Sequence, residues 1–324
     1  MKKLLIIVVL LVVGTRIFAQ EREIFLADPT IYVENGKYYL VGTKNRPPLG
    51  FSILESKDLK NWTVPGGSTD SLFMILNKGD HTFGDKGFWA PQIFKEGSTY
   101  YLTHTANEQT VLTESQSLKG PFRQEKVGPI DGSEKNIDSF IYQDEDGQHY
   151  LYHVRFNNGN YLWVAKFDME TGTIDPSTLK QCFGQTEDWE ATPNYESAPI
   201  MEGPTVIKLK SKYYLFYSAN HFMNIDYAVG YATADSPMGP WTKYEGSPII
   251  HRSIVGENGS GHGDLFTGLD DQLYYVYHVH NSKDQVSPRR TRIVPVNMKW
   301  NKKTGVYDFS VKANKVIVPV QVTK

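Results

Sequence analysis

The sequence lacks the features of a cross-linked, membrane-spanning or nucleic-acid-binding protein. Its one cysteine, Cys182, excludes an intrachain disulfide, so the core alone must stabilise the fold. A formal net charge of −2 gives no reason to expect a nucleic acid or an anionic membrane as partner. The longest apolar run, residues 4–13, is about half as long as a bilayer span requires. No long segment repeats its apolar residues with the 3.6-residue period of an amphipathic helix.

The first residues match a secretory signal peptide. Two lysines, the apolar run and a segment of small residues that ends near Ala19 follow one another in residues 1–19. No cysteine stands at the expected cleavage site to accept a lipid. We therefore expect a periplasmic or secreted protein without a membrane span, whose residues 20–324 form a single domain that works as a monomer.

Aromatic residues are abundant, at 13% of the chain, and they recur in one repeated pattern. In residues 201–217 an acid followed by Gly and Pro opens an alternating strand, which turns at residues 210–212 into an aromatic strand. Five such hairpins begin at Asp28, Trp89, Asp138, Glu202 and His262, so the spacings are 61, 49, 64 and 60 residues. This interval is the size of a four-stranded blade, which predicts an all-β, five-bladed β-propeller.

The segments that follow the hairpins support this interpretation. Residues 54–62, 113–122 and 232–241 each combine a short strand, a polar turn and a late aromatic residue, and they predict the third and fourth strands of a blade. The paired tyrosines at the same place in each hairpin are expected to pack between blades. Residues 168–183 and 187–195 have weaker periodicity, and we expect them to be loops that elaborate the third blade.

The five leading residues should meet in one pocket, because the first strand of every blade lines the propeller axis. Three carboxyl groups in a partly enclosed pocket repel one another when ionised, so at least one should have a raised pKa. A protonated and an ionised carboxyl group are what hydrolysis of a glycosidic bond requires. Trp89 offers a flat face to a sugar ring, and His262 can hydrogen-bond sugar hydroxyls or help to hold an ion on the axis.

With these motifs the chain resembles the family 43 glycoside hydrolases, which are five-bladed propellers. The matching segments are residues 27–30, 89–93, 137–140 with 144–147, 202–204, and 261–262 followed by residue 266. The resemblance implies an inverting mechanism with Asp28 as general base, Glu202 as general acid and Asp138 as the residue that tunes the pKa of Glu202. In inverting enzymes the acid and the base are roughly 6.5–9.5 Å apart.

The resemblance implies two further binding roles and no required cofactor. His262 resembles an axial histidine that lies beside a Ca²⁺ or Na⁺ ion in many members. Residues 289–293 resemble a late basic strand that supplies a substrate-binding arginine. Strand alternation places Arg289 and Arg292 on opposite faces, and we favour Arg289 over Arg290 and Arg292.

Several alternatives remain open at this stage. The expected activity is an exo-acting α-L-arabinofuranosidase on arabinose- or xylose-containing polysaccharides, with a β-xylosidase or an exo-galactanase as the nearest alternatives. A glycan-binding propeller without catalysis is disfavoured because all three carboxyl groups are present. Asp28 and Glu202 could instead open turns, Trp89 could fill the core, and His262 could be structural. Five other histidines lie near expected strand ends, where they could line the pocket: His104, His153, His221, His278 and His280.

Overall fold

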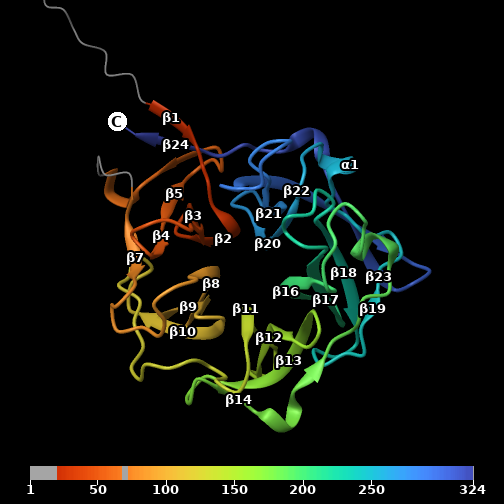
Figure 1. Cartoon of the computed structure of the whole chain (residues 1–324), viewed down its shortest axis with the longest axis horizontal. Coiled ribbons are helices and arrows are strands. Elements are labelled where there is room, and N and C mark those ends of the chain that lie inside the picture. Colours follow the sequence, from red (N-terminus) through yellow and green to blue (C-terminus); the bar gives the residue numbers. More distant parts are fainter. Residues whose placement is uncertain (1–19, 68–71, 324) are drawn as a thin grey trace, which may run out of the picture.

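The computed structural model describes residues 20–67 and 72–323, and the expected signal peptide lies outside them. Five sheets, antiparallel except for one pair of strands in the first, surround a central axis in chain order, which confirms the five-bladed propeller (Figure 1). The described residues contain one short α-helix, α1 (Arg252–Val255), and four 3-10 turns at Pro65–Gly67, Pro176–Thr178, Asp188–Glu190 and Ala313–Lys315. None of these helices is long and apolar enough to cross a membrane.

The two inner strands of each blade correspond to the five predicted hairpins. The first strands lie nearest the axis (Figure 1): β2 (Ala27–Glu34), β8 (Trp89–Glu96), β11 (Asn136–Gln143), β16 (Met201–Leu209) and β20 (Gly261–Thr267). Their antiparallel partners are β3 (Lys37–Thr43), β9 (Thr99–Ala106), β12 (His149–Phe156), β17 (Lys212–Ala219) and β21 (Leu273–Val279).

The outer strands are shorter and less regular. The third positions hold β5 (Leu54–Ser56), β10 (Gln109–Ser115), β13 (Asn160–Asp168), β18 (Ala228–Ala234) and β22 (Arg290–Asn301). Outside them lie β6 (Asn61–Thr63), β14 (Thr173–Ile174), β15 (Lys180–Gln181), β19 (Thr242–Lys243) and β23 (Val306–Val311). A separate pair, β4 (Gly50–Ser52) with β7 (Met74–Asn77), flanks the first blade.

Two expectations about the outer strands need correction. Residues 168–183 were expected to be a loop, but β14 and β15 both pair with β13 and satisfy backbone groups that its outer edge would otherwise leave open. The second blade has three strands, and its fourth is reduced to a single bridge between Glu114 and Arg123. The neighbouring Phe122 is nevertheless fully buried, as the late aromatic of that segment should be.

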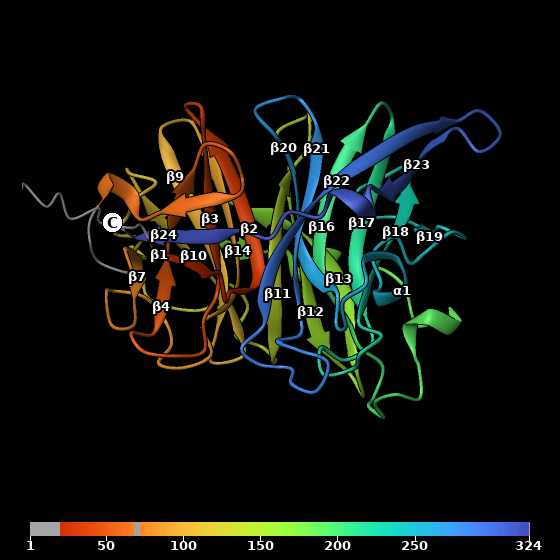
Figure 2. The same ribbon diagram turned by 90° about the horizontal axis from the view of Figure 1, so that it is seen from above.

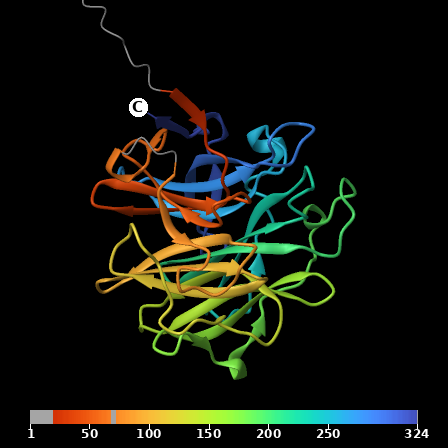
Figure 3. The same cartoon turned by 60° about the vertical axis from the view of Figure 1, so that its left-hand side comes forward.

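The first blade joins the two ends of the described chain. β24 (Val320–Thr323) pairs in parallel with β6, and β1 (Gln20–Glu23) pairs with β24 on its outer side (Figure 3). Aromatic contacts between neighbouring blades confirm the role predicted for the paired tyrosines. Tyr38 packs edge-on against Phe266 at 6.1 Å, and Tyr142 packs against Tyr213 at the same distance.

Loops that join the second and third strands lie on the face where the first strands begin, because each second strand runs back toward that face (Figure 2). They are short in the second and third blades, at residues 107–108 and 157–159. They are longer in the fourth and fifth blades, at residues 220–227 and 280–289, and in the first blade, where residues 44–49 lead from β3 to β4 before the third strand begins. Any site at this mouth is therefore walled mainly by the first, fourth and fifth blades.

Candidate active site

Each of the five first strands contains the same irregularity near its start. The pairing with the second strand shifts at that point, and one residue takes a left-handed conformation. These residues and their φ angles are Asp28 (46°), Ala90 (46°), Asp138 (56°), Gly203 (62°) and His262 (41°). Four of them are not glycine, which marks a backbone conformation that the surrounding structure must hold in place.

This register corrects the predicted equivalence of the five leading residues. Trp89 and Glu202 each stand one residue before the left-handed position, whereas Asp28, Asp138 and His262 occupy it. The sequence contained a signal for this offset, because the left-handed residue precedes proline in three of the blades, at Pro29, Pro91 and Pro204. The side chains of Trp89 and Glu202 therefore leave the strand one residue earlier than those of Asp28, Asp138 and His262.

The left-handed residues surround the axis. Together with the one or two residues that follow each of them, they line a cavity of about 20 Å³, which is room for little more than one water molecule. Backbone N–H groups at these positions bond side chains of the preceding blade. Examples are Ala90 to Thr43 Oγ1 at 2.9 Å and Asp138 to Thr105 Oγ1 at 2.9 Å. Hydrogen bonds between neighbouring blades thus hold the irregular starts of these strands in place.

Asp28 is buried, with 7% of its surface exposed, and basic groups surround it. Burial alone would raise the pKa of Asp28, but the charge of Arg289 and the rings of His262 and His278 outweigh it and hold the pKa well below its usual range. Its Oδ1 lies 3.1 Å from an Arg289 guanidinium nitrogen and 3.3 Å from His278 Nδ1. Asp28 is therefore an ionised carboxylate near neutral pH.

Glu202 has the opposite electrostatic environment. It is 8% exposed, and burial raises its pKa to about 7, although a hydrogen bond from Tyr227 acts in the lowering direction. Tyr227 Oη donates to Glu202 Oε1 at 2.7 Å. Tyr227 itself is fully buried and stacks on His278 with ring centroids 5.6 Å apart. Near neutral pH a large share of Glu202 therefore carries a proton.

The charges of both other carboxyl groups act on the third one, Asp138. Burial raises its pKa well above the usual value, and the negative charges of Glu202 and Asp28 add to this rise. The backbone N–H of Gly203 bonds to Asp138 and acts in the lowering direction. Because Gly203 directly follows Glu202, this bond ties Asp138 to the start of the strand that carries Glu202.

The structure separates the three late arginines. Arg289 reaches the site, where it contacts Asp28 and lies over the ring of Phe222 at 4.7 Å. Arg290 and Arg292 instead pair with Glu257, at 2.9 Å and 2.6 Å. Only Arg289 of the three is therefore placed to meet a substrate.

Trp89 is partly exposed at the mouth and is not core filling. Its Nε1 donates to Asn45 Oδ1 at 3.0 Å, which fixes the indole against the 44–49 loop. A Cβ built on Gly87 would lie 3.2 Å from the ring, so the indole lies close to the backbone at residue 87.

His262 lies on the axis beside the carboxylates. Its Nδ1 is 3.4 Å from Asp28 Oδ1 and 3.9 Å from Asp138 Oδ2, and burial lowers its pKa, so the ring is neutral. No group of three or more His, Cys, Asp or Glu side chains within residues 20–67 and 72–323 is arranged to hold a metal ion. The protein side chains here do not form a metal-binding set, and the axial ion suggested by the sequence stays a prediction.

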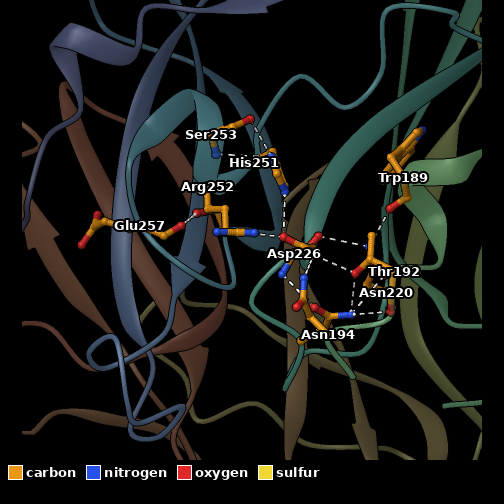
Figure 4. A network of polar contacts seen from close by, with 11 residues as sticks. Trp189, Thr192, Asn194, Asn220, Asp226, His251, Arg252, Ser253 and Glu257 are labelled. Carbon is orange, nitrogen blue, oxygen red and sulfur yellow. Dashed lines mark hydrogen bonds and ion pairs between the residues drawn. The ribbon is translucent and has the colours of Figure 1, made fainter. Parts of the chain in front are cut away.

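A polar network surrounds Asp226, the residue that directly precedes Tyr227 (Figure 4). At its centre, Asp226 accepts hydrogen bonds from Thr192 Oγ1 at 2.8 Å and from Arg252 Nε at 2.5 Å. Asn194 and His251 also approach this carboxylate. Burial would raise the pKa of Asp226, but these donors lower it to about 2. The network thereby joins α1 and residues 192–194 to the residue that precedes Tyr227.

Sequence reasoning identified part of this group and missed the rest. His278 was one of five histidines considered, and it contacts Asp28; His104 and His153 are fully buried as well, but no ion pair joins them to a carboxylate of the described residues. Burial lowers the pKa of His104 to about 3 and that of His153 to about 4, so both are neutral core residues. Tyr227 was missed because it lies in a loop outside the repeated hairpin pattern.

The arrangement places an ionised carboxylate, a protonated carboxyl group and an arginine at one mouth of a propeller. A model of the glycosyl hydrolases family 43 matches residues 22–303. The chain belongs to this family. It is therefore a glycoside hydrolase by descent, and the family implies a polysaccharide or oligosaccharide substrate.

Related proteins of several specificities resemble this member of family 43. A structure titled as an endo-1,4-β-xylanase from Bacteroides thetaiotaomicron is 36% identical, with a TM-score of 0.84 and coverage of 94% of this chain and 99% of that one. A β-D-galactofuranosidase of Aspergillus niger is 25% identical over 83% of this chain and 78% of its own length. A putative β-xylosidase of Escherichia coli is 24% identical, and the alignment spans only 47% of that protein.

Proposed function

We propose that this family 43 enzyme hydrolyses glycosidic bonds with inversion, with Asp28 as general base and Glu202 as general acid. The observation that carries the proposal is the opposite shift of two buried carboxyl groups in one site. The pKa of Asp28 lies well below its usual range and that of Glu202 is raised to about 7. An acid and a base can then coexist at one pH.

In the proposed reaction, Asp28 removes a proton from a water molecule while the water oxygen attacks the anomeric carbon. The bond between that carbon and the glycosidic oxygen breaks, and its electron pair stays on the oxygen. Glu202 donates its proton to this oxygen, so the leaving group departs as a neutral alcohol. Arg289 and His278 keep Asp28 ionised before the attack.

Asp138 is proposed to act through Glu202 and not on the substrate. Its bond with the Gly203 N–H supports a positioning role. Its negative charge, when present, would resist ionisation of Glu202 and so keep the acid protonated. Trp89 and Arg289 are proposed to bind the sugar that lies next to the water.

For the sugar, we propose a terminal α-L-arabinofuranosyl unit removed by an exo-acting enzyme in the periplasm or outside the cell. An exo-α-(1→5)-L-arabinofuranosidase of Streptomyces avermitilis, 26% identical over 91% of this chain, supports this choice, as do the long loops that wall the mouth. Cleavage of β-xylosidic bonds is the second candidate, and the 36% identical structure titled as an endo-xylanase favours it.

One experiment tests both the sugar and the mechanism. The purified enzyme is mixed with 4-nitrophenyl α-L-arabinofuranoside, β-D-xyloside or β-D-galactoside, and proton NMR follows the anomer formed first. Arabinose released with inverted configuration is the expected result. Release of xylose alone selects the second candidate, and retained configuration contradicts the assignment of Asp28 as a base.

A further inference from the structure

A second recess opens directly beside Asp28, on the same face of the propeller. It has a volume of about 440 Å³, and its walls come from the 44–49 loop of the first blade and the end of the 280–289 loop of the fifth. Arg289 belongs both to this recess, here called the side cleft, and to the reacting site. A ligand in the side cleft therefore lies against the same chain segment that holds the general base.

The side cleft is strongly basic. Three of its lining residues are Lys44, Arg46 and Arg289, and no aspartate or glutamate of the described chain lines it. Arg289 is neutralised by Asp28 at 3.1 Å. Neither Lys44 nor Arg46 has a carboxylate within ion-pair distance in residues 20–67 and 72–323. Two positive charges of the cleft are thus left without a counter-charge.

Lys44 is the more informative of the two cations because it is buried, with only 5% of its surface exposed. Its Nζ donates to the Pro48 carbonyl, which leaves further donor capacity unused. Burial, and then the charge of Arg46, lower its pKa to about 8. A buried ammonium group without an anion is unfavourable, and a bound anion would remove that penalty.

The remaining lining of the cleft is mixed, and part of it is apolar and suits a sugar ring. Phe25 is partly buried there, and Pro288 stands on the same lining. An aromatic face beside hydrogen-bond donors is the usual combination in a pocket for a carbohydrate. The cleft therefore combines the two features that an acidic sugar would need, a flat apolar surface and fixed positive charge.

We propose that the side cleft is a subsite for a hexuronic acid unit of the polysaccharide, whose carboxylate is held by Lys44 and Arg46. This inference rests on the proposed glycosidase function and adds a substrate class to it. A guanidinium group can bind a carboxylate through two parallel hydrogen bonds, and the ammonium group of Lys44 adds a point charge beneath it. The natural substrate would then be an acidic polysaccharide, with a glucuronic or a galacturonic acid near the scissile bond.

The test compares each acidic substrate with its own carboxyl-reduced form, which differs only by a neutral alcohol. Arabinoxylo-oligosaccharides with a glucuronic acid branch form one pair, and arabinose-bearing oligogalacturonates form the other. The readout is the ratio of kcat/KM for the acidic over the reduced substrate. We expect a ratio of about ten for the preferred pair, which corresponds to about 1.4 kcal/mol.

The ratio should fall several-fold in Arg46→Gln, because the side chain of Arg46 is exposed and can be replaced without disturbing the fold. It should fall to about one in the double variant that also carries Lys44→Met. Lys57→Met is the matched control, because this lysine is exposed on the same blade but does not line the cleft. It should keep the wild-type ratio. Sodium chloride at about 1 M should reduce the ratio, since it screens the exposed charge of Arg46.

The outcomes separate this proposal from the proposed function. A wild-type ratio near one for both pairs, or a high ratio that survives both substitutions, overturns the subsite. The pair with the larger ratio identifies the source of the uronic acid. If no oligosaccharide is hydrolysed, the proposed function fails, and calorimetric binding of the same pairs to the wild-type protein decides the subsite alone. Tighter binding of the acidic form, lost in Arg46→Gln, would still support it.

Discussion

Replacing Tyr227 by phenylalanine should make the enzyme work at more alkaline pH. The Tyr227 hydroxyl donates to Glu202 Oε1 at 2.7 Å, and this bond favours the ionised form of Glu202. Its removal leaves burial, the largest influence on this pKa, less opposed. Because the general acid must be protonated to act, a higher pKa for Glu202 extends activity upward in pH.

The size of this effect follows from the strength of the bond. A hydrogen bond to a charged group contributes roughly 1.5–3 kcal/mol, and part of it survives when Glu202 is protonated, so we assign about 1.4 kcal/mol to the difference. This equals about one pKa unit, which moves Glu202 from about 7 to roughly 8. At pH 8 the protonated fraction then rises from about a tenth to about a half.

The assay is the pH dependence of kcat/KM between about pH 5 and 9.5, with an oligosaccharide whose leaving group needs protonation. Tyr231→Phe is the matched control, because Tyr231 lies in β18, the strand that directly follows Tyr227. It is also fully buried, and it hydrogen-bonds the backbone at Tyr307 and Phe309, away from the site. Its alkaline limb should not move. An unchanged or acid-shifted limb in Tyr227→Phe would refute the argument that this hydroxyl sets the pKa of Glu202.

Three further predictions test the charges of the site and the fold. Glu202→Ala should reduce the rate of oligosaccharide hydrolysis by a factor of about 10²–10⁴, but it should affect aryl glycosides with good leaving groups far less. Asp28→Ala should impair hydrolysis of both substrates. Equal losses on both substrates in Glu202→Ala would contradict its role as acid. Arg289→Met removes the charge that most lowers the pKa of Asp28, so the acid limb of kcat/KM should move to higher pH, and an unmoved limb would argue against this pairing. Lys243→Met removes the cation that lies 2.6 Å from the fully buried carboxylate of Glu190. It should lower the free energy of unfolding, measured by urea titration, by about 3–5 kcal/mol. A loss below about 1 kcal/mol would show that other groups stabilise the buried charge of Glu190.

The sequence predicted the blades well because each inner hairpin has its own local signals. Alternation, the turn residues and the paired aromatics recur five times, and local patterns of this kind predict strands and turns without knowledge of distant contacts. The register at the strand starts was predicted less well. A bulge shifts the strand register by one residue and leaves the pattern of residue types recognisable. Trp89 and Glu202 therefore seemed equivalent to Asp28, although they stand one residue before the left-handed position that Asp28 occupies. The proline that follows the left-handed residue in three blades was the available signal.

The charged surroundings of the carboxyl groups could not be predicted in the same way. Tyr227 and Lys44 lie in loops between the second and third strands, and loop conformation is set by contacts that are distant in the sequence. For Tyr227 these contacts include a close approach to Gly261, where an added Cβ would lie 2.4 Å from its ring. For the substrate-binding arginine, the resemblance gave three candidates in residues 289–293, and the sequence favoured Arg289 among them. The ion pairs of Arg290 and Arg292 with Glu257, which set these two apart, could not be predicted.

The site shows how a repeated fold can give two carboxyl groups opposite properties. Asp28 and Asp138 occupy equivalent left-handed positions, with φ angles of 46° and 56°, and both are almost fully buried. The backbone therefore cannot explain why the pKa of one falls and that of the other rises. The difference comes from the neighbours, since Arg289 of the fifth blade contacts Asp28, whereas the charge of Glu202 acts on Asp138. Moving a single cation from one blade boundary to another would thus be expected to change which carboxyl group can act as the base, with the fold unaltered.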